Sequence, residues 1–261
     1  MGEWVKRMDY NSTELMACVA SRVLEDGKSV FVGTGLPIIA TMLAQRIHAP
    51  NLLVVFEAGG IGPQIPTIPI SVGDSRTFYK ACMAASMDYA MGMAQQGLVD
   101  YGFLGAAQID KYGNLNTTVI GNYEKPKARL PGSGGANDLG SLCGKTITLM
   151  RHDKLRFVDK LDFLTTPGYL NGPGSREKAG LPKDTGPYRV ITQLAVMGFH
   201  PETKEMTLLS VHPGVTVDEV LDNTGFKLLV GGDVTETNPP TDTELRLLRR
   251  EIDPAGIVIG K

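Results

Sequence analysis

One predicted strand, which ends in a carboxylate, constrains the possible folds of this chain more than any other segment does. Residues 52–56 form a run of apolar side chains that includes two valines, which is typical of a strand buried on both faces of a parallel sheet. Glu57 follows the run directly, and Gly59 and Gly60 come soon after it. Open α/β sheets bind ligands at the carboxyl edge of their strands. The pattern therefore predicts Glu57 at that edge, beside glycines that let a substrate approach the backbone closely.

Two interpretations of Glu57 are open from its position alone. A glutamate that is buried or half-buried is costly unless it is paired or used in chemistry, which favours a catalytic carboxylate. A solvated residue at a strand end, or a cap on a neighbouring helix, explains the position equally well. The surroundings of the side chain decide between these interpretations.

The segment before this strand predicts a βαβ unit. A strand is expected over residues 29–32, followed by a glycine turn and a helix that leads into the strand at 52–56. The crossover should be right-handed. The turn contains Gly33, Thr34 and Gly35 at the start of the helix, where backbone amides can cradle a phosphate or a carboxylate. A tight strand-to-helix turn is the alternative interpretation.

A glycine-rich segment farther along is a second candidate for a site. Gly132, Gly134 and Gly135 leave backbone amides free to donate to a developing oxyanion or a phosphate, and Asn137 follows them. A flexible linker is the alternative, although a predicted strand comes soon afterwards and linkers seldom lie inside such alternating structure. Gln108 opens another turn that is dense in hydrogen-bonding side chains. We take these five as further candidate site residues.

The rest of the chain continues the alternation of helices and strands. Strands are expected at residues 101–107, 146–150, 190–197, 206–211 and 257–259, and helices at 81–97 and after the capping pairs Asn11–Glu14, Thr216–Glu219 and Thr241–Glu244. The stretch 165–187, with five glycines and four prolines, predicts a long ordered loop rather than a domain boundary. Four methionines between residues 83 and 93 favour core or interface packing over an adaptable binding surface. We therefore predict an α/β fold in which residues 1–261 form one domain.

Composition and charge exclude several classes of function. The net charge of -2, with basic residues spread along the chain, argues against binding to nucleic acid or to an anionic membrane. The basic stretch at residues 151–160 contains acids as well and predicts a solvated face. No apolar run reaches membrane-spanning length, and residues 1–4 lack the apolar start of a leader.

The cysteines and histidines give no sign of a disulfide or a metal site. Neither disulfide nor metal-ligand spacing is present among these residues, which are Cys18, Cys82, Cys143, His48, His152, His200 and His212. We expect a cytoplasmic protein without a metal site, whose histidines are surface or core residues.

Taken together, these motifs resemble the B (beta) subunits of family I coenzyme A transferases, most closely the glutaconate-type enzymes. The similarity extends from about residue 11 to residue 254. The motifs that carry it are, in order, residues 33–35, Glu57, 105–110, 113–114, Tyr123, 132–137, 167–168, 172–174, 212–213, 223–226 and 251–254. The family usually has a small polar residue directly after the glutamate, where this chain has Ala58.

The resemblance implies a three-layer α/β/α fold with a mostly parallel sheet, shared with ribose-5-phosphate isomerase. It also implies that Glu57 is the nucleophile and that the glycine-rich loop at 132–137 borders the CoA thioester. The enzyme would move CoA between an acyl-CoA and a mono- or dicarboxylic acid through a glutamyl-CoA thioester. The CoA thioester is then a substrate, and no further cofactor is implied. An A (alpha) subunit would complete a heterotetramer or a larger assembly.

Other functions are compatible with the same fold. An acyl-CoA hydrolase would use the same glutamate, whereas a similar decarboxylase has cysteine at that position and steroid-ring hydrolases lack the glutamate. A small-molecule-sensing module would be non-catalytic. Glu57 favours transfer over decarboxylation, and a carboxylate that is ionised at neutral pH needs no general base to act as a nucleophile.

Overall fold

The computed structural model describes residues 10–260 of the chain. Residues 1–4, where no leader is expected, lie outside the described residues, as does Lys261. The strands of the main sheet are β1 (Ser29–Phe31), β2 (Leu53–Val55), β3 (Gly60–Ile61), β4 (Met83–Ala84), β5 (Tyr101–Leu104), β10 (Lys145–Leu149), β11 (Gly186–Ile191), β12 (Ala195–Phe199), β13 (Met206–Val211) and β14 (Leu229–Glu236). Two small hairpins are formed by β6 (Gln108–Ile109) with β7 (Leu115–Asn116) and by β8 (Val119–Gly121) with β9 (Pro126–Arg129).

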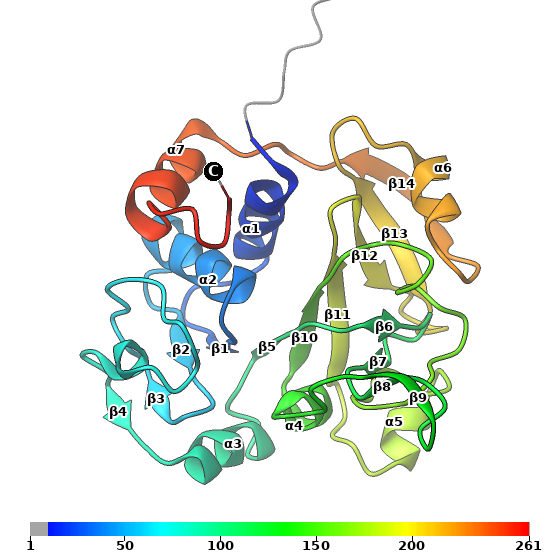
Figure 1. Cartoon of the computed structure of the whole chain (residues 1–261), viewed down its shortest axis with the longest axis horizontal. Helices are drawn as coiled ribbons and strands as arrows, with labels where there is room; N and C mark the ends of the chain where they lie inside the picture. The colour runs from blue at the N-terminus through cyan, green and yellow to red at the C-terminus, as the bar shows by residue number, and fades with distance from the viewer. Residues whose placement is uncertain (1–9, 261) are drawn as a thin grey trace, which may run out of the picture.

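The main sheet has ten strands in the order β14-β13-β12-β11-β10-β5-β1-β2-β3-β4 (Figure 1). The five strands from β11 to β2 are parallel to one another, so their carboxyl ends share one edge of the sheet. Antiparallel pairs flank this parallel centre on both sides. The predicted α/β fold with a mostly parallel sheet is confirmed.

Helices cover both faces of the sheet. They are α1 (Ser12–Arg22), α2 (Leu36–Ile47), α3 (Met87–Gln95), α4 (Ala136–Leu142), α5 (Ser175–Lys178), α6 (Val217–Asp222) and α7 (Asp242–Leu247), which continues as a π-helical turn, η2 (Leu248–Ile252). Val30 and Val54 face a core with α1, α2 and η2, whereas Phe31 and Val55 face a second core with α3, α4 and α6. Because successive side chains of a strand point to opposite faces, this alternation confirms that the central strands are buried on both sides.

The predicted helix caps hold the two ends of the described chain together. Glu14 closes a capping box at the start of α1, and Glu244 does the same for α7. Each carboxylate also pairs with an arginine from the other end, at 2.6 Å from Arg249 to Glu14 and 2.6 Å from Arg22 to Glu244. The same two carboxylates therefore stabilise both the helix ends and the packing of α1 on α7 and η2.

Two predicted strands differ in the structure. Residues 190–197 form parts of two antiparallel strands, because the Thr192 hydroxyl accepts hydrogen bonds from the amides of Leu194 and Ala195 and closes a turn between β11 and β12. Residues 257–259 form no strand, since their amides donate to the Asp253 carboxylate at 2.7 to 3.0 Å. In both places a side-chain acceptor replaces the ladder of a sheet, and such local competition is hard to see in a hydrophobic pattern.

The predicted helix over residues 81–97 is shorter in the structure. Met83 belongs to β4, which pairs with β3, and helix α3 begins only at Met87. Met83 is 44% exposed and Met87 is 55% exposed. The sequence favoured packing either in the core or at an interface, and core packing is wrong for these two methionines. Strand β14 and the hairpins β6–β7 and β8–β9 were not predicted.

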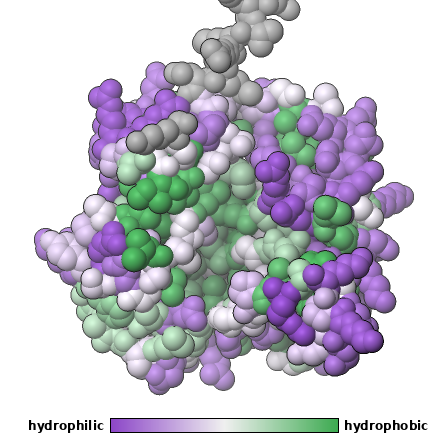
Figure 2. All heavy atoms as spheres, viewed as in Figure 1, coloured by the Kyte–Doolittle hydropathy of each residue, from purple (hydrophilic) through white to green (hydrophobic). Residues whose placement is uncertain are grey.

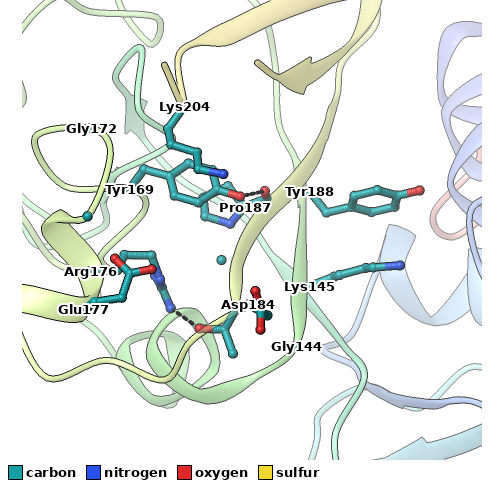
Figure 3. A pocket seen from close by; sticks show the side chains of 13 residues that line it. Gly144, Lys145, Tyr169, Gly172, Arg176, Glu177, Asp184, Pro187, Tyr188 and Lys204 are labelled. Atoms are coloured by element: carbon teal, nitrogen blue, oxygen red, sulfur yellow. Dashed lines mark hydrogen bonds between the residues drawn. The ribbon is translucent and has the colours of Figure 1, made fainter. Parts of the chain in front are cut away.

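The long segment 165–187 is an ordered loop that contains α5, and Arg176 holds it in place. This side chain is 2% exposed, and its guanidinium donates to the carbonyls of Gly140 and Gly168 and to the Thr185 hydroxyl. Gly140 belongs to α4, so Arg176 joins this helix to the loop. Arg176 lines a cavity of about 280 Å³ at the amino edge of the sheet, where β10 and β11 begin (Figure 3). The Arg176 guanidinium is therefore engaged by acceptors of the same chain.

Two of the four histidines belong to the core. His152 stacks on Phe157 with ring centroids 3.7 Å apart, and its two ring nitrogens lie 3.3 Å and 3.0 Å from the hydroxyls of Thr192 and Thr224. Burial lowers the pKa of His152 to about 4 and also lowers the pKa of His212. Both imidazoles are thus held in the neutral form.

Acid should destabilise the fold through His152. Its pKa is about 4 in the fold against 6.5 without burial, so between these values the unfolded chain binds more protons. The free energy of unfolding should be retained above pH 6.5 and should fall by roughly 3 kcal/mol towards pH 4. Denaturant titrations between pH 4 and pH 6.5 measure the slope of the free energy of unfolding against pH. His152→Gln should flatten it, and the exposed His48→Gln should not; an unchanged slope in His152→Gln would contradict the assignment.

Candidate active site

Glu57 is the first residue of a tight hairpin at the carboxyl edge of the sheet. Phe56 is fully buried, and two backbone hydrogen bonds of 2.9 Å, from its amide to Gly60 and from Gly59 to its carbonyl, close the turn between β2 and β3. Glu57 is half-buried. Within residues 10–260 its carboxylate has no hydrogen-bond or ion-pair partner. It caps no helix, which removes one of the non-catalytic interpretations.

The start of α4 lies against the Glu57 carboxylate. A Cβ atom placed on Gly135 would be 3.5 Å from Glu57 Cδ and 3.6 Å from its Oε1, so the carboxylate touches a bare stretch of backbone. Gly135 is the N-cap residue of α4 and has no side-chain cap. The amides of Gly134 and Gly135 find no acceptor in the described part of the chain. Two free donors beside a carboxylate form the arrangement that a developing oxyanion requires.

Two adjoining cavities open at this edge. The first, of about 220 Å³, is lined by Glu57, Gly134 and Gly135, together with the ends of β1 and β5. The second, of about 570 Å³, lies on the side of α1 and α2 and includes Thr34. The two share the residues Gly33, Val72, Phe103, Leu104 and Gly105. The predicted turn at residues 33–35 therefore borders the same site as the glutamate, and Gly35 shapes it as the N-cap residue of α2 with φ of 81°.

Gly59 and Gly60 pack closely against the backbone of neighbouring segments. A Cβ atom on Gly59 would lie 2.1 Å from the carbonyl oxygen of Ala85, and one on Gly60 would lie 2.0 Å from that of Thr77. Neither glycine lines the two cavities at the sheet edge. They allow the hairpin to reverse and to pack against the end of β4 and η1 (Ser75–Phe78), and this packing fixes the position of Glu57.

Three other candidates are tied into the fold beside the site. Gln108 Oε1 accepts hydrogen bonds from Asn116 Nδ2 at 2.7 Å and from the Asp162 amide at 3.1 Å. Asn137 Nδ2 donates to the Thr165 carbonyl at 2.8 Å. The Gly132 amide donates to the Thr117 carbonyl at 2.9 Å. These bonds fix the loops around the glycine-rich turn, and none of the three residues lines the two cavities.

Sequence reasoning missed part of the lining. Val72, Phe103 and Leu104 form apolar walls shared by both cavities, and Met91 packs against Gly135, with its Cε 2.5 Å from a Cβ placed there. Arg151 is exposed, as predicted for this basic stretch, and it also lines the larger cavity. The sequence feature that could have identified Arg151 is its position directly after the strand predicted at residues 146–150. Within residues 10–260, no three histidine, cysteine or acidic side chains gather as a metal site requires.

Comparisons with known proteins agree with this geometry. A family model described as coenzyme A transferase matches residues 13–223. The B subunit of glutaconate CoA-transferase from Acidaminococcus fermentans is 39% identical over 251 residues, covering 94% of each chain. The B subunit of 3-oxoadipate CoA-transferase from Pseudomonas knackmussii is 39% identical over 241 residues, covering 92% of each. The crystal structure of the A. fermentans glutaconate coenzyme A-transferase matches with a TM-score of 0.93 and 36% identity, over 97% of this chain and 99% of that one.

Proposed function

The chain belongs to the coenzyme A transferase family, and we propose that it is a B-type subunit whose Glu57 carries CoA during turnover. The observation that supports this role is the half-buried Glu57 carboxylate, which has no partner in the described residues and lies against Gly135, the N-cap residue of α4. The two relatives at 39% identity are transferases by name, so hydrolysis, decarboxylation and sensing are not favoured.

The chemistry divides one difficult exchange into steps that use the same carboxylate. Glu57 attacks the carbonyl carbon of the acyl-CoA, the carbon–sulfur bond breaks, and CoA thiolate leaves a mixed anhydride on the enzyme. The thiolate then attacks the glutamyl carbonyl and expels the first carboxylic acid as its anion, which leaves a glutamyl-CoA thioester. An acceptor carboxylate reverses both steps and restores Glu57.

The free amides at the start of α4 have a defined task in these steps. Each attack creates a tetrahedral intermediate with a negative oxygen, and the amides of Gly134 and Gly135 belong to the loop that lines the same cavity as Glu57. Losing one such donor typically costs about 10²–10³ in rate. Water must also be excluded, because the anhydride would otherwise hydrolyse. The apolar walls formed by Phe103 and Leu104 serve this purpose.

A partner of A type would complete the site. The two relatives are named as B-type halves, which implies a second kind of chain and an assembly that we propose to be a heterotetramer or larger. Exposed apolar side chains occur in the segments that follow the Glu57 hairpin in the chain, among them Ile70 (85%), Met87 (55%) and Tyr89 (50%). Figure 2 shows a hollow near the centre of the molecule, with hydrophobic residues on its floor. These surfaces suit coverage by another protein chain.

The proposed substrates are short dicarboxylic acyl groups. Glutaconate and 3-oxoadipate, the acids in the names of the two relatives, both carry two carboxylates. The three cysteines are free, and no helix within residues 10–260 is long and apolar enough to cross a membrane. We propose a cytoplasmic enzyme with no cofactor of its own, acting on acyl-CoA and carboxylic acid and not on nucleic acid or membranes.

The partner should be essential for transfer. The chain purified alone should show no CoA transfer above background, whereas the chain co-purified with its A-type partner should exchange CoA between a dicarboxylic acyl-CoA and a free acid. Omitting the acceptor acid should leave only slow release of CoA, which separates transfer from hydrolysis. Robust transfer by the isolated chain would refute the shared site, and acceptor-independent turnover by the complex would refute the transferase role.

A further inference from the structure

Arg151 is an exposed cation on the wall of the larger cavity, and it finds no partner in the described part of the chain. It follows β10 by two residues and lines the 570 Å³ cavity. No hydrogen bond or ion pair involves its guanidinium within residues 10–260. We propose that Arg151 binds the second carboxylate of a dicarboxylic acyl group and so determines which acyl chains react. This inference rests on the proposed transferase function.

Nearby basic side chains either have partners within the chain or lie outside the two cavities. Arg156 pairs with Asp153 three residues before it, and buried Arg176 donates to backbone carbonyls. Lys154 is exposed, as Arg151 is, but it lines neither cavity at the sheet edge. Arg151 alone in this basic stretch combines a place on the cavity wall with a guanidinium that the described chain leaves available.

The strand order sets the distance between Arg151 and the nucleophile. Glu57 follows the end of β2 and Arg151 follows the end of β10, and β1 and β5 lie between these strands. Three strand spacings amount to about 14 Å. Glu57 lines the smaller cavity and Arg151 lines the adjoining larger one. A glutamate side chain, an acyl chain of about four to six carbons and an arginine side chain can together span a separation of this order.

The two cavities offer such a chain a continuous path. They meet at Gly33 and Gly105, where β1 and β5 end. A Cβ atom on Gly33 would meet no other atom within 4 Å, so the route over the sheet edge is open there. Val72 and Phe103 line both cavities with apolar surface. Apolar walls that lead to a single cation match methylene groups that end in a carboxylate, because a charged group needs a charged or hydrogen-bonding partner once it leaves water.

The symmetry of the reaction extends the inference to the second substrate. The departing acid and the incoming acid react in turn with the same Glu57 carbonyl, so they occupy the same place. Arg151 should therefore contact the distal carboxylate of the donor acyl group and that of the acceptor acid. A contact to the CoA moiety would affect all acyl-CoAs alike and would leave the free acceptor unaffected.

The test compares acyl chains that differ only at their far end. The assembled enzyme with Arg151→Gln is assayed with glutaryl-CoA and pentanoyl-CoA as donors, and with glutarate and pentanoate as acceptors. We expect kcat/KM for glutaryl-CoA to fall roughly 10- to 100-fold, as for a lost charge-assisted hydrogen bond. The value for pentanoyl-CoA should stay within about twofold, and the KM for glutarate should rise. Lys154→Gln is the matched control and should change kcat/KM for neither donor.

Two outcomes would overturn the inference. An equal loss for glutaryl-CoA and pentanoyl-CoA would place Arg151 against the CoA phosphates or in the support of the fold. No loss for either donor would leave it without a role in binding. In both cases transfer by the unaltered complex would leave the proposed function intact, whereas a complex that transfers CoA from neither donor would refute that function itself.

Discussion

Replacement of Glu57 by glutamine should reduce CoA transfer by the assembled enzyme by at least about 10⁴-fold, in line with losses seen when other covalent enzymes lose their nucleophile. The amide of glutamine has nearly the same shape as the carboxylate but is a far poorer nucleophile and cannot form the anhydride. The expected loss is therefore in kcat, with the binding of acyl-CoA largely kept.

The fold should survive this substitution. Glu57 is half-buried and accepts no hydrogen bond in the described residues, so glutamine leaves no broken interaction behind. Exposed or half-buried substitutions of this kind change stability by about 0.5 kcal/mol or less. Denaturant midpoints of the two proteins should thus coincide, which separates a lost nucleophile from a lost fold.

Trapping the intermediate gives a direct measurement. The unaltered complex is incubated with acyl-CoA and no acceptor, reduced with borohydride, digested and analysed by mass spectrometry. The modified peptide should contain Glu57, and Glu57→Gln should yield no such peptide. A modification at another residue, or a glutamine variant that retains substantial turnover, would exclude Glu57 as the nucleophile.

The parts of this fold that a single strand or helix dictates could be predicted from sequence. The apolar run ending at Glu57 is a central strand, and its parallel neighbours place the carboxylate at the ligand edge of the sheet. Glu14 and Glu244 identify helix starts because a capping box is a local pattern of four residues. Glu57 and the turn at residues 33–35 could be found for the same reason, since each follows directly from the end of a predicted strand.

The parts that depend on which groups meet in the folded chain could not be predicted. Gly59 and Gly60 look like open space for a substrate until β4 and η1 are seen packed against them. The amides of residues 257–259 look available for a sheet until Asp253 accepts from them. The availability of Arg151 depends on which acids lie near it in space, and its position in a basic stretch suggested only solvent.

Gly60→Ala should be among the most damaging substitutions outside the cavities. The backbone at Gly60 needs no special conformation, but the added methyl would lie 2.0 Å from the carbonyl oxygen of Thr77, and Gly60 is buried. A clash with backbone cannot be relieved by turning a side chain. The free energy of unfolding should fall by roughly 3 kcal/mol, the upper end of the usual cost of overpacking.

The same substitution should also impair transfer, because Gly60 accepts the hydrogen bond from Phe56 that closes the Glu57 hairpin. A shift of the carboxylate by about 1 Å can cost 10²-fold in rate. Gly73→Ala is the matched control: its added methyl would meet nothing within 4 Å, and stability should stay within about 0.5 kcal/mol of the unaltered protein. Denaturant titrations and transfer rates of both variants measure the two effects. If Gly60→Ala proved as stable and as active as Gly73→Ala, the packing of β3 on η1 would not be what holds Glu57 in place.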